Sequence, residues 1–166
     1  YSDGEPILWY SPNPRMVLFP KDLKISNSME QVLRGGRFKV TFNNSFDEVI
    51  SNCKLIDRSN QGQHGTWITN EMQKAYIGLH NDGIAKSVEV WEDKKLVGGL
   101  YGLEVGNIFC GESMFNKVSN ASKVALIALA HDNKKGYELI DCQVYNNHLA
   151  SLGAKEIERD LFLGYL

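Results

Sequence analysis

The chain has 166 residues, of which 43% are hydrophobic and 23% charged, and this is the size and composition of one globular domain. Its net charge of -2 argues against a protein that holds nucleic acid mainly through a broad basic surface, although local basic patches stay open. Membrane spans and secretion are unsupported, because the chain has no run of about 18 apolar residues and residues 1–5 have neither a basic start nor an apolar segment.

The N-terminal part contains all four prolines, at positions 6, 12, 14 and 20. Because proline fixes φ and lacks a backbone donor, we expect extended or turning chain there, with short strands at residues 7–10 and 16–19. We interpret residues 1–20 as a strap or domain junction. The missing initial Met suggests that a further segment precedes it.

Capping patterns predict the first helices. Residues 28–31 (SMEQ) form a capping box, so a short helix should begin at Ser28 and stop before the glycines at 35 and 36, followed by a strand at residues 38–42. Ser45 opens a second capping box, and an apolar face with helical spacing follows it. This face, which we expect to pack in the core, consists of Phe46, Val49, Ile50 and Cys53.

A polar, Gly-rich stretch at residues 59–65 predicts a surface loop, and Thr69 should cap the next helix. Its expected buried stripe is Met72, Ala75, Tyr76 and Leu79. From residue 86 the pattern alternates with period two, which predicts an antiparallel meander with strands around residues 88–90, 96–103 and 108–111.

The last part of the chain alternates helices and strands. We expect a connection at residues 112–119, a helix at 121–130 that is apolar almost all round and capped by Asn120, and a strand at 139–144. A short helix opened by residues 146–148, a strand at 154–157 and a helical or irregular tail should follow.

The strand at residues 139–144 carries the first indication of chemistry. Side chains alternate along a strand, so Ile140, Cys142 and Val144 should face a core while Asp141 and Gln143 project together from the other face. The alternative is an edge strand whose polar face is simply solvated.

The three cysteines, Cys53, Cys110 and Cys142, are widely spaced and lie among apolar neighbours. This pattern predicts buried free thiols in a reducing cytoplasm and no structural metal.

The element order predicts an α/β (α+β) fold of the GNAT-like acyltransferase type, with a mixed, mostly antiparallel sheet flanked by helices. Acetyl-CoA enzymes of this fold hold the pyrophosphate with backbone amides of a Gly-rich loop at a helix start. The corresponding connection, residues 112–119, has no glycine. We therefore expect an acyl donor of another kind.

Nearly the whole chain resembles the leucyl/phenylalanyl-tRNA-protein transferases. The resemblance lies in residues 8–12 (LWYSP), 65–69 (GTWIT), 88–91 (VEVW), 97–102 (VGGLYG), 109–115 (FCGESMF), 120–123 (NASK), 139–143 (LIDCQ) and 150–154 (ASLGA). It implies that residues 21–166 are a GNAT-like catalytic domain, that residues 1–20 join it to a small, mostly missing N-terminal domain, and that a short C-terminal extension is also missing.

The implied reaction is transfer of Leu, Phe and, less well, Met from aminoacyl-tRNA to the N-terminal Arg or Lys of a protein, which marks it for degradation by the N-degron pathway. The resemblance makes Asp141, Gln143 and Glu112 the catalytic residues. Gln143 would contact the attacking amine while Asp141 orients it and supports proton removal. Glu112, and more weakly Asn146, would bind the acceptor. For Glu112 the alternative is a structural contact with a helix N-terminus.

The resemblance also implies an aminoacyl side-chain pocket and a tRNA contact. The pocket residues are Trp67, Leu100, Phe109, Met114 and Ile140, for which the alternative is plain core packing. The tRNA-binding residues are Arg34, Arg37 and Lys39, although Glu30 and Gln31 stand where some members are basic. We expect no cofactor, no metal and no membrane binding, and a monomer in the cytoplasm.

Two other functions stay open. One is a GNAT enzyme that uses acetyl-CoA, which would bind that cofactor. The other is a non-catalytic module that recognises basic N-termini through an acidic pocket and shows peptide affinity without turnover.

Overall fold

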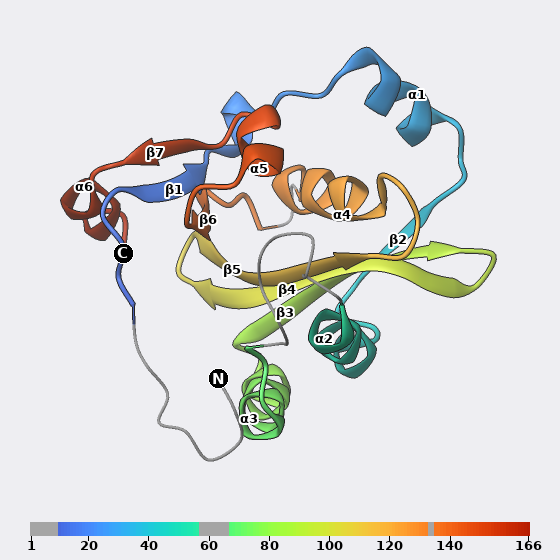
Figure 1. The fold of residues 1–166 in the computed structure, drawn as a ribbon, viewed down its shortest axis with the longest axis horizontal. Coiled ribbons are helices and arrows are strands. Elements are labelled where there is room, and N and C mark those ends of the chain that lie inside the picture. The colour runs from blue at the N-terminus through green and yellow to red at the C-terminus, as the bar shows by residue number, and fades with distance from the viewer. Residues whose placement is uncertain (1–9, 57–66, 133–134) are drawn as a thin grey trace.

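The computed structural model describes residues 10–56, 67–132 and 135–166 of the chain (Figure 1). The strands in these ranges are β1 (Arg15–Leu18), β2 (Lys39–Phe42), β3 (Ala85–Glu92), β4 (Lys95–Val105), β5 (Ile108–Asn116), β6 (Leu139–Gln143) and β7 (Lys155–Ile157). The helices are the 3-10 helix η1 (Pro20–Asp22) and α1 (Asn27–Arg34), α2 (Phe46–Leu55), α3 (Asn70–Asn81), α4 (Ala121–Ala130), α5 (Asn147–Ser151) and α6 (Arg159–Leu163). Within the described ranges, no helix has the length and apolar character needed to cross a membrane.

The strands form one sheet in the order β2-β3-β4-β5-β6-β1-β7. Neighbouring strands are antiparallel except for β5 and β6, which run parallel. Figure 1 shows α4 over one face of the sheet and α2 and α3 over the other. The predicted fold, a mixed and mostly antiparallel sheet flanked by helices, is therefore confirmed.

Two apolar cores lie on the two faces of the sheet. Under α2, the predicted face of Phe46, Val49, Ile50 and Cys53 is buried together with Tyr101. On the opposite face, α4 buries most of its residues against β3, β4 and β5, as expected for a helix that is apolar almost all round.

The predicted helix starts are partly right. Thr69 caps α3 by accepting the Met72 N–H, as expected. At α1 the cap is Ser26, which accepts the Met29 N–H, so the prediction of Ser28 is wrong by two residues. Ser45 precedes α2 but makes no side-chain cap, and the buried carboxylate of Glu89 accepts the Ser45 N–H instead.

The predicted stripe of α3 is only partly buried. Met72, Tyr76 and Leu79 are half-buried, whereas Ala75 is exposed and Ile77 packs against the core instead. The helix contacts β3 and α2 at the edge of the molecule, so none of its residues is fully buried.

Strand β5 is longer than predicted. Residues 112–116, expected in the connection to the next helix, continue the strand because β4 pairs with them from Tyr101 opposite Ser113 to Gly98 opposite Asn116. The connection to α4 is therefore only residues 117–120, and the prediction of a connection at residues 112–119 is wrong. Asn120 stands at the start of α4 with a left-handed φ of 70° and makes no side-chain cap.

Strand β1 confirms the strand expected at residues 16–19 and lies between β6 and β7. Residues 15–18 thus belong to the same sheet as the rest of the described chain, across the boundary expected at residue 20. The predicted strand at residues 7–10 lies outside the described residues except for Tyr10, which is not in a strand. The predicted loop at 59–65 also lies outside them, and the upstream domain stays a prediction.

Candidate active site

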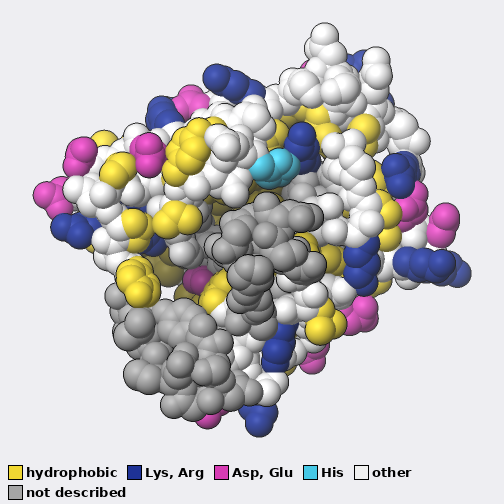
Figure 2. All heavy atoms as spheres, viewed as in Figure 1, with side chains coloured by type: hydrophobic (Ala, Val, Ile, Leu, Met, Phe, Trp, Pro, Cys, Tyr) yellow, Lys and Arg dark blue, Asp and Glu magenta, His cyan; other side chains and the backbone are white. Residues whose placement is uncertain are grey.

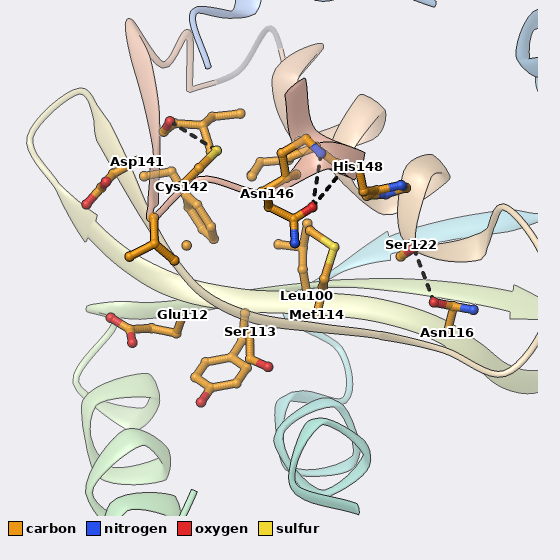
Figure 3. Close-up of a pocket in the computed structure, with 18 of the residues that line it drawn as sticks. Leu100, Glu112, Ser113, Met114, Asn116, Ser122, Asp141, Cys142, Asn146 and His148 are labelled. Carbon is orange, nitrogen blue, oxygen red and sulfur yellow. Dashed lines mark hydrogen bonds between the residues drawn. The ribbon is translucent and has the colours of Figure 1, made fainter. Parts of the chain in front are cut away.

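A cavity lies where the parallel strands β5 and β6 part. The two strands pair only from Ile108 opposite Leu139 to Cys110 opposite Asp141. Beyond these residues β5 continues along β4, whereas β6 ends at Gln143. The cavity has a volume of about 480 Å³ and takes its walls from both strands and from α4 and α5 (Figure 3).

The apolar wall contains every residue that the resemblance assigned to the aminoacyl pocket. Trp67, Leu100, Phe109, Met114 and Ile140 all line this one cavity. In Figure 3, Leu100 and Met114 lie side by side, and they are cross-strand partners of β4 and β5. These five residues come from four parts of the sequence. Leu100, Phe109, Met114 and Ile140 pack in the core under α4, whereas Trp67 packs against the core under α2.

Helices α4 and α5 contribute wall residues that sequence reasoning missed. Leu126 and Leu129 of α4 and Leu149 of α5 line the cavity. The apolar character of α4 all round its axis gives no sign of which residues face the sheet and which face a cavity.

Polar residues lie on the same cavity. Glu112, Asp141 and Asn146 line it, and Figure 3 shows Glu112 and Asp141, which lie on the neighbouring strands β5 and β6. The Asn146 side chain accepts the backbone N–H groups of His148 and Leu149 and so caps α5. The structure thus brings together three of the four predicted catalytic and acceptor-binding residues.

Gln143 departs from the predicted alternation. Its φ of 65° is left-handed, so the strand ends there, and its Nε2 donates to the Gly111 carbonyl at 2.9 Å. Ile140 and Cys142 face the core as predicted, but Val144 lies beyond the turn and is 60% exposed, so its predicted core position is wrong.

Asp141 has a partner that the sequence did not indicate. Its buried carboxylate forms a bidentate pair with Arg15 of β1, with Nε to Oδ1 at 3.0 Å and Nη2 to Oδ2 at 2.6 Å. Oδ1 also accepts the Gln143 backbone N–H at 2.9 Å. Because Arg15 and Asp141 are 126 positions apart, no local pattern relates them.

Burial raises the pKa of the Glu112 carboxyl, and the negative charge of Asp141 acts in the same direction. Hydrogen bonds from Tyr76 of α3 and from Gln143 lower it in part. Burial and then the neighbouring Glu112 also raise the pKa of Tyr76. These contacts of Glu112 involve a mid-helix tyrosine and a strand amide, so nothing in them supports the alternative of a helix N-terminus.

Replacing Glu112 by Gln should flatten the pH dependence of stability. A raised carboxyl pKa favours the protonated form in the folded state, so the stability that Glu112 contributes is present at low pH and is lost as the pH rises above its ordinary value of 4.5. As the pH rises above 4.5, the free energy of unfolding should therefore decrease less for Glu112→Gln than for the wild type. The measurement is urea unfolding at a series of pH values. Glu156→Gln, at an exposed position of β7, is the control, and an equal slope in wild type and Glu112→Gln would contradict the expectation.

The three cysteines, all in the described ranges, form no disulfide; Cys53 is buried as predicted, whereas Cys110 and Cys142 are only partly buried. Burial raises the pKa of Cys110 to about 11 and that of Cys142 to about 12. Both thiols are therefore protonated at neutral pH and poor nucleophiles.

The predicted tRNA-binding residues lie away from the cavity, on α1, β2 and the segment between them. Arg34 pairs with Glu30 at 2.6 Å, and Arg37 pairs with Glu92 at 2.5 Å. Both pairs are largely exposed, so each is weak and can open to a phosphate. Figure 2 shows Lys and Arg side chains dispersed over the face it presents, with Asp and Glu among them.

Comparison with known proteins gives consistent matches. A family model described as leucyl/phenylalanyl-tRNA protein transferase matches residues 17–166. A protein of that name from Flavobacterium johnsoniae is 61% identical over 100% of this chain and 78% of its own length. One from Pectobacterium carotovorum is 55% identical over 100% of this chain and 69% of its own length.

The fold also occurs among solved structures. A conserved protein of unknown function from Bacteroides thetaiotaomicron superimposes with a TM-score of 0.58 at 16% sequence identity, over 84% of this chain and 54% of that chain. At this identity the likeness concerns the fold alone.

Proposed function

Since this chain belongs to the leucyl/phenylalanyl-tRNA-protein transferase family, it is an aminoacyltransferase, and we propose that its acceptors are proteins that begin with Arg or Lys. Methionyl-tRNA serves as a weaker donor beside the leucyl and phenylalanyl forms, and the extended N-terminus acts as a degradation signal. The observation that carries the proposal is the single cavity in which an apolar wall meets Glu112 and Asp141.

The apolar wall binds the donor side chain. Leu, Phe and Met, whose β carbons are unbranched, fit this wall, whereas the β-branched Ile and Val fit poorly. Met114 adds an adaptable thioether to the wall, which helps one pocket accept both an aliphatic and an aromatic side chain.

The acidic side of the cavity binds the acceptor. Arg15 already balances the charge of Asp141, so Glu112 supplies the negative charge that is left for the acceptor's ammonium group or basic side chain. Asn146, on the same wall, is a second polar contact for the acceptor. This arrangement selects a basic N-terminal residue over a neutral one.

The reaction is aminolysis of the aminoacyl ester: the acceptor's α-amine forms a peptide bond with the ester carbonyl carbon, the ester C–O bond breaks, and the tRNA leaves with its terminal hydroxyl protonated. The ester is already activated, so the protein must align the two reactants, favour the neutral amine and stabilise the tetrahedral oxyanion. An α-amino group has a pKa of roughly 7.7 to 8.0, so much of it is protonated at neutral pH and must lose a proton before attack. Gln143 contacts the amine, and Asp141 orients Gln143 and supports proton removal.

Arg34, Arg37 and Lys39 bind phosphates of the acceptor stem. Such contacts position the RNA without reading its sequence, so donor choice rests on the aminoacyl group in the cavity. The acidic partners Glu30 and Glu92 are displaced when the RNA binds.

Transfer of labelled Leu and Phe from charged tRNA should occur to a peptide that begins with Arg and not to a matched peptide that begins with Ala. The selectivity follows from the charge of Glu112 in the cavity, and it is measured by peptide labelling with and without the protein. Equal labelling of both peptides would refute the acceptor assignment. Peptide binding without labelling would favour a binding module, and calorimetric binding of acetyl-CoA would favour the other acyl donor.

A further inference from the structure

Both oxygens of the Asp141 carboxylate are bound inside the protein. Arg15 donates to each of them, and the Gln143 backbone N–H donates to Oδ1. The Asp141 side chain is fully buried, so its position is decided by these donors. A planar guanidinium matches a carboxylate in this two-bond geometry, which fixes orientation as well as charge.

The Arg15 guanidinium also contacts an aromatic ring. Its guanidinium carbon lies 4.7 Å from the centroid of the Phe162 ring of α6. Phe162 is 3% exposed and packs with Val17, Ile108 and Leu139. The Arg15 side chain is 13% exposed and does not line the cavity, whereas Asp141 does. Arg15 therefore does not touch a substrate bound in the cavity.

Gln143, whose backbone N–H donates to Asp141, has a backbone conformation that is rare for its residue type. Gln143 has a φ of 65°, which non-glycine residues adopt rarely and keep only when their surroundings hold them there. Two hydrogen bonds do so here: the backbone N–H to Asp141 Oδ1 and the side-chain Nε2 to the Gly111 carbonyl, each at 2.9 Å.

We propose that Arg15 is a positioning residue for aminoacyl transfer, which holds both oxygens of Asp141 and thereby fixes the place where the Gln143 amide meets the acceptor amine. The proposal rests on the role of Gln143 in the proposed function. It joins three elements, α6, β1 and β6, in one line of contacts, from Phe162 through Arg15 and Asp141 to Gln143. Each contact in this line is direct, and Asp141 is the member of the line that lies on the cavity wall.

The test is a double-mutant cycle with Arg15→Met, Asp141→Asn and the double variant, together with Arg15→Lys. Arg15→Met should lower kcat about a hundredfold and leave KM for aminoacyl-tRNA unchanged, because a misplacement of about 1 Å has this effect on rate. The double variant should be no slower than Asp141→Asn alone, because Arg15 acts through Asp141. Arg15→Lys keeps the charge without the two-bond geometry and should fall between wild type and Arg15→Met.

Lys155→Met is the matched control, since it removes an exposed cation of β7 that pairs with Asp22 and should transfer at the wild-type rate. Urea unfolding curves show which variants are folded in the assay. If Arg15→Met is unfolded, Arg15→Lys decides, with an unchanged kcat overturning the proposal. Fold-changes that multiply in the double variant, or a raised KM at constant kcat, would also overturn it. Absence of transfer by the wild type would instead refute the proposed function.

Discussion

Asp141→Asn should lower kcat for peptide transfer by about a hundredfold to ten-thousandfold, which is the range for losing a group that assists proton transfer. The amide keeps the size of the side chain but removes its negative charge. It can no longer accept two bonds from Arg15 and one from the Gln143 backbone with the same strength. The measurement is the single-turnover rate of label transfer to the Arg-initiated peptide at saturating enzyme.

The same substitution should destabilise the fold, because it leaves the largely buried Arg15 guanidinium without a carboxylate. Breaking a buried pair by removing one partner costs about 3–5 kcal/mol, so the rate must be measured where urea unfolding shows the variant to be folded. Asp22→Asn is the matched control: Asp22 pairs with Lys155 at the surface, where an ion pair contributes little to stability, and transfer should be unaffected. A folded Asp141→Asn that transfers at the wild-type rate would exclude Asp141 from the reaction.

Much of the fold could be predicted because local signals and tertiary packing agree. The apolar spacing that begins at Phe46 predicted α2 and its buried face, and the side chain of Thr69 caps α3 as its position suggested. Agreement was poorer where a distant residue takes over a local role. Ser45 makes no side-chain cap for α2, and its backbone N–H, which Glu48 would accept in a capping box, donates to Glu89 on β3 instead.

The close approach of α4 to the sheet illustrates a relation that sequence alone could not give. A Cβ on Gly98 of β4 would lie 2.5 Å from the Ala121 Cβ, so only a glycine lets the start of α4 come this near. The sequence shows the Gly98-Gly99 pair but not which helix approaches it. Leu126 and Leu129, further along the same helix, line the cavity, and neither residue was predicted to do so.

In the candidate site too, some residues were predicted from the sequence and others were missed. Its strand residues were found because Glu112 and Asp141 lie in strings that carry the resemblance, and the cavity contains both. Arg15 was missed because its relation to Asp141 arises only when β1 inserts between β6 and β7. The left-handed φ of Gln143 was missed because strand alternation assumes regular backbone to the end of the strand.

Met114→Trp should lower kcat/KM for phenylalanyl-tRNA by a factor of about 10 to 200, with a smaller loss for leucyl-tRNA. Met114 and its cross-strand partner Leu100 stand side by side on the cavity wall, so an indole at this position occupies volume that the donor needs. A misfit of one or a few methylene groups in an apolar pocket has an effect of this size. The check is kcat/KM for both donors with the same Arg-initiated peptide.

Met114→Leu is the matched control, because it keeps the volume and the apolar character and should hold both donors within about a few-fold of the wild type. The half-buried position of Met114 limits the cost of the larger ring to roughly 1–3 kcal/mol of stability, which urea unfolding would detect separately from the rate. The ratio of the two donors distinguishes a donor subsite from general damage. Damage to the fold lowers both rates equally, whereas a filled subsite discriminates against the larger side chain. An unchanged ratio in Met114→Trp would therefore remove Met114 from the donor pocket and leave it as core packing.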